Sequence, residues 1–274
     1  MSLIYLIGIG PGAPEYLTMQ AVETLRKVDV FFILEKEGRG KEALAEARLR
    51  ILDTYCTPGS YRIVTAPSPP RAPAGDDYRG VVADWHARKN QLFAGLISEH
   101  LAPGQIGGVL AWGDPALYDS SIAIFRSIQQ GILPDLRFEV IPGITSAQLL
   151  AARHRITLNT VGEDVLITTA RRMEEGSCAG HSTAVVMLDS NAAFRRIPPE
   201  DFDIYWGSHL GSADEVLMSG ALAEVGDAIA ATVAREKRRL GWIFDIYLLR
   251  RKKKKGQGAA LDPPGGSGPL DPIL

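Results

Sequence analysis

A glycine-rich loop near the start of the chain is the first group of residues suited to binding a ligand. The apolar run Leu3–Ile9 predicts a strand, and the segment GIGPGAPEYLTMQ begins at its end with Gly8. Loops of this kind often hold a nucleotide phosphate at the beginning of a helix. Gly8, Gly10 and Ala13 fit the dinucleotide pattern G-x-G-x-x-(G/A), so a nicotinamide-dependent oxidoreductase is one interpretation.

Two features of this loop argue for a different ligand. In dinucleotide-binding folds the helix begins inside the glycine motif, so that its N–H groups face the pyrophosphate. Here Pro11 has no N–H to donate, and helical periodicity begins only near Thr18, which we predict as the N-cap. Asp29 begins the second predicted strand, whereas a ribose-binding acid would end it. We therefore expect a backbone wall that a flat or bulky ligand can approach closely.

A second loop with polar side chains, AWGDPALYDSS, follows the predicted strand Ile106–Trp112. Its Gly-Asp-Pro sequence predicts a sharp turn in which the carboxylate of Asp114 is free to bind a ligand. The alternative is a structural role, with an Asx turn at this point and a helix cap from Asp119 or Ser120. Both interpretations are open.

A third loop joins the predicted strand Arg137–Ile141 to a helix that begins near Thr145, in the segment EVIPGITSAQLLAARHRI. The hydroxyl groups of Thr145 and Ser146 either cap this helix or contact a ligand, and one role does not exclude the other. All three loops follow strands of a predicted parallel sheet, and ligands bind outside the carboxyl ends of such strands. We expect the loops to meet in one cleft.

Alternating strand and helix patterns in the first half predict an α/β fold, with a mostly parallel sheet and helices on both faces. The other strands of this half are predicted at Asp29–Leu34 and Tyr61–Thr65. Its helices are predicted at Thr18–Lys27, Lys41–Asp53, Asp77–Leu101 and Ser120–Gln130, the last with Gly131 at its C′ position.

After Pro142 strands outnumber helices, which predicts antiparallel pairing and a second, mixed sheet with helices. We predict an N-terminal α/β domain over residues 1–142, a C-terminal mixed α/β domain over 143–250 and a disordered tail over 251–274. The elements expected after Pro142 are strands at Val165–Thr169, Ala184–Leu188, Phe202–Trp206, Val216–Met218 and Trp242–Leu249, and helices at Thr145–His154 and Leu222–Arg235.

The composition indicates a globular protein and argues against several partners. The chain has 274 residues, of which 46% are hydrophobic. Before Arg250 there are 24 basic and 30 acidic residues, so we expect no nucleic acid as partner. With two isolated cysteines, no apolar run that could span a bilayer and no signal-peptide features, we expect a cytoplasmic protein without disulfides or membrane contact. The five histidines show no ligand spacing, so we expect no metal.

The three loops together resemble the signature loops of the tetrapyrrole methylases, which transfer methyl groups from S-adenosylmethionine (SAM) to porphyrin-like intermediates. GIGPG, GDPALYDS and VIPGITSAQLLAARHRI occur in the family's order, and the resemblance covers about residues 1–250. DYRGVVADWHARKNQLF and RHRITLNTVGEDVLITTARR are most similar to the branch that methylates ring carbon 1 of precorrin-5, with release of acetate, in aerobic cobalamin synthesis. The resemblance implies a two-domain homodimer that binds SAM between its domains and produces S-adenosylhomocysteine.

The resemblance also implies which residues contact the cofactor. They lie in the three loops and in the second domain: Ile9, Pro11, Asp114, Leu117, Thr145, Ser146, Leu188 and Gly211. Met187-Leu188-Asp189 stands where Tyr-Met-Gly is usual, so this sequence departs from the family pattern at one of these contacts.

The reaction that the resemblance implies needs no covalent nucleophile from the protein. A sulfonium is already a strong electrophile, so alignment and exclusion of water are the main requirements for methyl transfer. Loss of acetate requires water to attack a carbonyl group, which a base and hydrogen-bond donors assist. We consider Tyr118, Asp119 and His154 for these catalytic roles. A packed ring, a helix cap and a surface histidine at a helix end are the structural alternatives.

Basic side chains near the predicted cleft are the expected substrate contacts, because precorrins carry many carboxylates and guanidinium groups pair well with them. These residues are Arg88, Lys89, Arg153, Arg155, Arg171 and Arg172. For any one of them a solvated surface position is the alternative. A protein that binds a tetrapyrrole without converting it is a third functional hypothesis, beside the methyltransferase and the oxidoreductase built on Gly8, Gly10 and Ala13.

Overall fold

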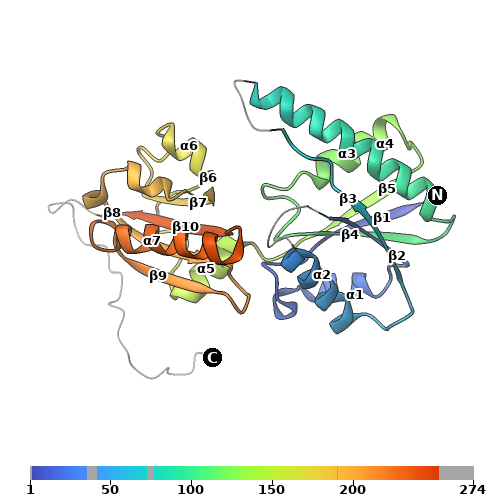
Figure 1. Cartoon of the computed structure of the whole chain (residues 1–274), viewed down its shortest axis with the longest axis horizontal. Coiled ribbons are helices and arrows are strands. Elements are labelled where there is room, and N and C mark those ends of the chain that lie inside the picture. Colours follow the sequence, from blue (N-terminus) through green and yellow to red (C-terminus); the bar gives the residue numbers. More distant parts are fainter. Residues whose placement is uncertain (1, 36–41, 73–76, 190, 253–274) are drawn as a thin grey trace.

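The computed structural model describes residues 2–35, 42–72, 77–189 and 191–252. These residues form two lobes, each built on a five-stranded sheet (Figure 1). In the N-terminal lobe the strand order is β3-β2-β4-β1-β5, and every neighbouring pair is parallel. The strands are β1 (Leu3–Gly8), β2 (Val30–Glu35), β3 (Arg62–Pro67), β4 (Ile106–Ala111) and β5 (Arg137–Ile141).

Helices cover both faces of the parallel sheet (Figure 1). They are α1 (Met19–Leu25), α2 (Glu42–Tyr55), α3 (Tyr78–His100) and α4 (Ser121–Gly131). Successive β1 residues point to opposite faces: Ile4 and Leu6 pack with α3 and α4, whereas Ile7 packs with α1 and α2. Because both faces are buried, the central strands are almost continuously apolar.

The C-terminal lobe is a mixed sheet in the order β6-β7-β10-β8-β9. β6 and β7 are parallel, whereas β10 is antiparallel to β7 and to β8, and β8 is antiparallel to β9. α6 and α7 pack on one face and α5 on the other, so the predicted fold class is confirmed. The strands are β6 (Val165–Thr169), β7 (Thr183–Asp189), β8 (Phe202–Ser208), β9 (Val216–Ala221) and β10 (Asp245–Arg251), and the helices are α5 (Ser146–His154), α6 (Ala170–Glu174) and α7 (Leu222–Leu240).

The chain passes from one lobe to the other in the segment between β5 and α5. β5 ends at Ile141 in the parallel sheet, and α5 packs Leu149 and Leu150 against the second sheet. The domain limits at residues 142 and 250 stay a prediction, because packing alone does not show where each part folds independently.

Several predicted details are wrong. Gly131 is the last residue of α4 rather than its C′ residue, and the cap is Ile132. Arg251, the first residue of the predicted tail, belongs to β10 and pairs with Phe202, and the N–H of Lys252 donates to the carbonyl oxygen of Asp201, so these two residues are not part of a tail. The remaining predicted tail, from residue 253, lies outside the described residues. The sequence analysis also missed α6 and three short 3₁₀ helices, η1 (Pro14–Tyr16), η2 (Ala193–Arg196) and η3 (Pro199–Asp201).

Within the described residues, no helix is both long and apolar enough to cross a membrane. Cys56 and Cys178 are buried free thiols. The same residues contain no group of three or more histidine, cysteine, aspartate or glutamate side chains that could hold a metal ion.

Candidate functional site

The three glycine-containing loops meet at the carboxyl edge of the parallel sheet. A Cβ atom placed on Gly8 would lie 2.5 Å from the nitrogen of Gly143 and 2.9 Å from the carbonyl oxygen of Gly113. A Cβ atom on Gly143 would lie only 2.1 Å from that same oxygen. The backbones of all three loops therefore touch, which only residues without a side chain allow.

Hydrogen bonds hold the loops in this arrangement. Gly10 and Gly113 exchange backbone hydrogen bonds, with N···O distances of 3.2 and 2.8 Å. The carboxylate of Asp114 accepts from the N–H of Ala116 at 2.7 Å and from the N–H of Gly143 at 2.8 Å. The predicted Asx turn is therefore present, and the prediction of a free carboxylate is wrong, because both oxygens are used in holding the second and third loops together.

The first loop continues into the 3₁₀ helix η1, and α1 begins only at Met19. Its predicted N-cap is confirmed, since the Thr18 hydroxyl accepts from Ala21 N at 3.1 Å. A dinucleotide fold would begin its helix within the glycine motif, so this geometry lacks the helix terminus that would face a pyrophosphate.

A large cavity, here called the main cavity, opens where the loops meet. Its volume is about 800 Å³, within the range of small-molecule sites, and both lobes contribute to its walls. Eight of the seventeen residues predicted to contact cofactor or substrate or to act in catalysis line it: Pro11, Asp114, Leu117, Tyr118, Asp119, Thr145, Ser146 and Leu188. Thr145 also forms a full capping box with Gln148, so its hydroxyl caps α5 at the edge of this cavity.

Leu188 reaches the main cavity because β7 bulges there. Across the ladder with β10, Asp245 pairs with Asp189 and Ile246 pairs with Met187, which leaves Leu188 as the extra residue. Its φ is +57°, and the residue is 60% exposed although it lies in a strand of the core. A β-bulge often turns a side chain away from the direction it would have in a regular strand. The left-handed backbone at Leu188 therefore directs its side chain toward the main cavity.

A second cavity of about 430 Å³ lies at the carboxyl ends of β2 and β4, beneath α2. It contains the side chains of Arg48 and Lys89, and the predicted cofactor residues do not line it. Leu44, Glu46, Trp112, Asp119 and Phe244 line both cavities, so the two are adjacent and Asp119 stands between them.

Aromatic rings form the boundary between the two cavities. Trp112 follows β4 and lies 5.9 Å, ring centre to ring centre, from Phe244 of the second lobe. Phe244 in turn packs edge to face on Trp242 at 4.5 Å. We call these three residues the aromatic group. It joins the lobes and offers apolar faces to both cavities.

Two of the predicted cofactor residues, Ile9 and Gly211, do not line either cavity. Ile9 is fully buried in the core beneath α1 and α2. Gly211 donates its N–H to Glu215 at 2.7 Å and lies against the Tyr16 ring, while its neighbours Leu210 and Ser212 line the main cavity. The sequence pattern located this loop but not the residues in it that line the main cavity.

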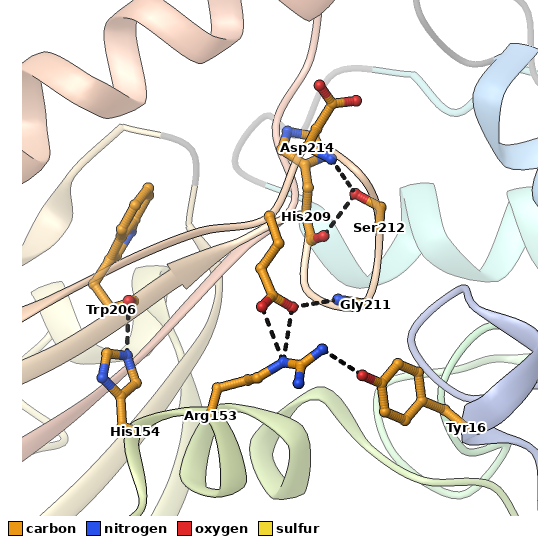
Figure 2. A network of polar contacts seen from close by, with 9 residues as sticks. Tyr16, Arg153, His154, Trp206, His209, Gly211, Ser212 and Asp214 are labelled. Atoms are coloured by element: carbon orange, nitrogen blue, oxygen red, sulfur yellow. Dashed lines mark hydrogen bonds and ion pairs between the residues drawn. The ribbon is translucent and has the colours of Figure 1, made fainter.

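The imidazole of His154 also faces away from both cavities. Its Nε2 atom lies 3.0 Å from the carbonyl oxygen of Trp206 (Figure 2). Its ring packs edge to face on Tyr205. We therefore correct its assignment from a reacting group to a contact between α5 and β8.

Arg153, predicted to bind substrate, is held by protein partners (Figure 2). Its Nε lies 2.9 Å from a carboxylate oxygen of Glu215, and its terminal nitrogen donates to the hydroxyl of Tyr16. Glu215 also accepts from the N–H of Gly211. This network joins η1, α5 and the loop after β8, so Arg153 fixes the wall of the main cavity instead of lining it.

The other basic residues predicted to bind substrate lie outside the main cavity. Arg88 pairs with Asp84 and Arg172 with Glu175, at 2.9 and 2.7 Å. Arg171 stacks on Tyr78 of the first lobe at 4.4 Å, and Arg155 is an exposed residue with left-handed backbone at the end of α5. Only Lys89 lines a cavity, the second one, where it also lies over the Trp85 ring. The expectation of an arginine cluster around the cleft is therefore wrong for these positions.

The sequence analysis missed a buried acidic pair in the wall of the main cavity. Asp189 and Asp245 are cross-strand neighbours, 4% and 6% exposed. Asp189 accepts from Tyr247 and from two backbone N–H groups, whereas Asp245 accepts only from Trp206, and its Oδ1 has no partner among the described residues. Burial and the neighbouring Asp189 raise the pKa of Asp245 well above its usual value. The available signal was an acidic residue, Asp245, within the apolar stretch Trp242–Leu249 that was predicted as a strand.

His209 is a second missed residue of the main cavity. It is 8% exposed, packs on Trp242 and has no Nε2 partner among the described residues. Burial lowers the pKa of its imidazole, which favours the neutral form. Its φ of +48° is uncommon for a non-glycine residue, and no pattern in the sequence marks it.

This fold and this cavity define a class of proteins. Residues 3–226 match the Tetrapyrrole (Corrin/Porphyrin) Methylases, and the chain belongs to that family. It is 45% identical over 251 residues to precorrin-6A synthase (deacetylating) from Sinorhizobium sp, covering 92% of this chain and 96% of the relative. A precorrin-2 C(20)-methyltransferase from Sinorhizobium sp is 30% identical, over 66% of this chain and 71% of the relative.

Solved structures of similar proteins have the same fold. A putative cobalamin-synthesis-related protein (CobF) from Corynebacterium diphtheriae is 35% identical, covers 91% of this chain and 98% of its own, and superposes with a TM-score of 0.76. A uroporphyrin-III C-methyltransferase from Thermus thermophilus, solved with S-adenosylhomocysteine, is 19% identical over 90% of this chain and 96% of its own, with a TM-score of 0.54. The similarity to the Thermus thermophilus structure concerns the fold alone.

Proposed function

We propose that the protein is a SAM-dependent C-methyltransferase that converts precorrin-5, SAM and water to precorrin-6A, S-adenosylhomocysteine and acetate. Membership of the methylase family and 45% identity to precorrin-6A synthase over almost the whole chain support this reaction. The observation that carries the proposal is the meeting of three loops, predicted from their sequences, around one cavity between the lobes.

The main cavity fits SAM, whose bound form supplies an electrophilic methyl group. Backbone from the glycine loops forms one wall, where a side chain at Gly8 or Gly143 would collide with main-chain atoms. Apolar contacts come from Leu117 and Leu188, and polar groups from Thr145 and Ser146. We assign Pro11, Leu117, Thr145, Ser146 and Leu188 to direct contact, and Asp114 to holding the loops that make it.

The protein's own groups have two tasks in this reaction. The aromatic group and the leucines exclude water and orient the reacting carbon, which accounts for methyl transfer without a covalent nucleophile. Asp119, which lines both cavities, is the proposed base for the water that attacks the acetyl carbonyl. The hydroxyl of Tyr118 donates to the carbonyl of Ile167 at 3.1 Å, so we assign Tyr118 to holding the lobes together.

The proposal includes a homodimer in the cytoplasm, as the family resemblance implies, with a small-molecule tetrapyrrole as the substrate. Sedimentation of the purified protein measures directly whether it is a dimer. A monomer at micromolar concentration that still turns over substrate would contradict the dimer without affecting the reaction.

Mass spectrometry of the reaction products tests the proposed activity. Precorrin-5 is incubated with the enzyme and SAM that carries a labelled methyl group, and acetate is measured in the same sample. We expect the macrocycle to gain one labelled methyl group and to lose a two-carbon unit that is recovered as acetate. Methylation without acetate would indicate another methyltransferase of the family, and binding without either product would support a carrier.

A further inference from the structure

The guanidinium group of Arg48 lies in the second cavity, and the sequence analysis did not single it out. Arg48 belongs to α2 and is partly buried. Its Nε donates to the carbonyl oxygen of Leu110 at 3.4 Å, and its Nη1 donates to that of Leu44 at 2.9 Å. These bonds hold the side chain at the end of β4, and within the described part of the chain Nη2 has no acceptor.

The charge of Arg48 has no ion-pair partner among the residues that the structure describes. Among the described side chains, no carboxylate lies within 4.0 Å of its nitrogen atoms, although Asp119 is close enough to act on it electrostatically. Burial lowers the pKa of Arg48 and the Asp119 charge raises it. Glu35 and Glu46 also line the cavity, but both are exposed to water. A partly buried guanidinium with only carbonyl partners favours an added anion.

The surroundings of Arg48 suit an anion carried on a flat ring system. Its guanidinium carbon lies 5.8 Å from the centre of the Trp112 ring, and Trp112 and Phe244 face both cavities. Lys89 adds a second positive charge to the same cavity. A macrocycle packed against the aromatic group would therefore carry its edge substituents toward Arg48.

We infer that Arg48 binds a carboxylate side chain of the tetrapyrrole and thereby fixes the orientation of the ring beside the main cavity. This inference rests on the proposed function for the identity of the ring. The pairing of a guanidinium group with a carboxylate on the ring is inferred from the residues of the second cavity and does not depend on the proposed function.

The test compares Arg48→Met, which keeps an unbranched apolar stem but removes the guanidinium group, with Arg48→Lys, which keeps the charge. For Arg48→Met we expect the KM for precorrin-5 to rise about 30-fold, which corresponds to about 2 kcal/mol for a lost charged pair. Arg48→Lys should recover part of this loss, and both variants should bind S-adenosylhomocysteine as the wild type does. Arg126→Met, an exposed arginine of α4 outside both cavities, is the matched control.

A binding measurement keeps this inference separate from the proposed reaction. Uroporphyrin, a flat octacarboxylate, is titrated with each protein and its fluorescence quenching is followed, which requires no turnover. Weaker binding by Arg48→Met, with Arg126→Met unchanged, supports the inference even if precorrin-5 is not the substrate. Equal binding by both variants would overturn it, as would a loss confined to kcat, because that result would mean that Arg48 acts only on Asp119.

Discussion

Asp114, in the loop after β4, accepts a hydrogen bond from the N–H of Gly143, in the loop after β5, at 2.8 Å. The same carboxylate closes its own turn through Ala116. One side chain therefore sets the distance between two of the three loops that line the main cavity.

Asp114→Asn should loosen this connection, because an amide group cannot accept both hydrogen bonds as a carboxylate does. We expect the free energy of unfolding to fall by roughly 1.5–3 kcal/mol, the usual contribution of a hydrogen bond to a charged group, and the affinity for S-adenosylhomocysteine to fall with it. Urea unfolding and calorimetric titration measure the two effects. The exposed Asp135→Asn is the control, and unchanged values for both variants would show that Asp114 does not hold the loops.

Gly143→Ala adds only one methyl group but should strongly reduce the stability of the protein. The added methyl group would lie 2.1 Å from the carbonyl oxygen of Gly113, so main-chain atoms of two loops must move apart. We expect a loss of stability of more than about 2 kcal/mol and loss of cofactor binding.

Gly95→Ala, in the middle of α3 with no atom within 4 Å of the new methyl group, is the matched control for this change. It should stabilise the protein by roughly 0.5–1 kcal/mol, because alanine is the better helix former. Similar effects at Gly143 and Gly95 in thermal unfolding would contradict the close packing of the loops.

The sequence predicted the parts of the fold that depend on local pattern. The apolar strands of the first sheet are long and buried on both faces, and the polar residues after them fall at one edge by the geometry of parallel sheets. That geometry is why Asp114, Thr145 and Ser146 could be placed together before the structure was known.

The missed parts depend on contacts between distant segments. Leu188 faces the cavity because of a bulge against β10, and Asp245 is part of the cavity wall because it pairs with Asp189. Arg153 was assigned to the substrate because its partners, Tyr16 and Glu215, lie 137 and 62 residues away in sequence. Local periodicity contains no information about such pairs.

Arg153→Met should weaken the contacts in the wall of the main cavity but should not change substrate binding. We expect a coupling energy of about 1 kcal/mol between Arg153→Met and Glu215→Gln in a double-mutant cycle, since the pair is partly exposed. The KM for precorrin-5 should change less than threefold. A large rise in KM with little loss of stability would restore the original assignment of Arg153 to the substrate.

Asp245→Asn should stabilise the protein at neutral and higher pH. The raised pKa means that the folded protein keeps a proton on Asp245 at pH values where the unfolded chain has released it. This contribution to stability is complete below the ordinary aspartate pKa, near 4, and is lost as pH rises through the folded pKa, at up to about 1.4 kcal/mol per pH unit.

Urea unfolding between pH 5 and 9 measures this effect. The wild type should lose stability with rising pH more steeply than Asp245→Asn, and the two curves should converge toward low pH. The exposed Asp227→Asn on α7 should follow the wild-type slope. Parallel curves for the wild type and Asp245→Asn would show that Asp245 is ionised in the folded protein.

Asp119→Asn should slow the release of acetate while leaving the cavity intact. Asp119 lines both cavities, and its Oδ1 accepts from the N–H of Ser121 at 2.6 Å, a bond that the asparagine oxygen retains. The amide cannot take a proton from water, so we expect acetate formation to fall by roughly 10²–10⁴-fold, the usual contribution of a general base. Binding of S-adenosylhomocysteine should be nearly unchanged.

His154→Ala, which removes an imidazole bonded to the Trp206 carbonyl outside both cavities, should release acetate at close to the wild-type rate. Normal release by Asp119→Asn would exclude Asp119 as the base, and slow release by His154→Ala alone would return that role to the histidine.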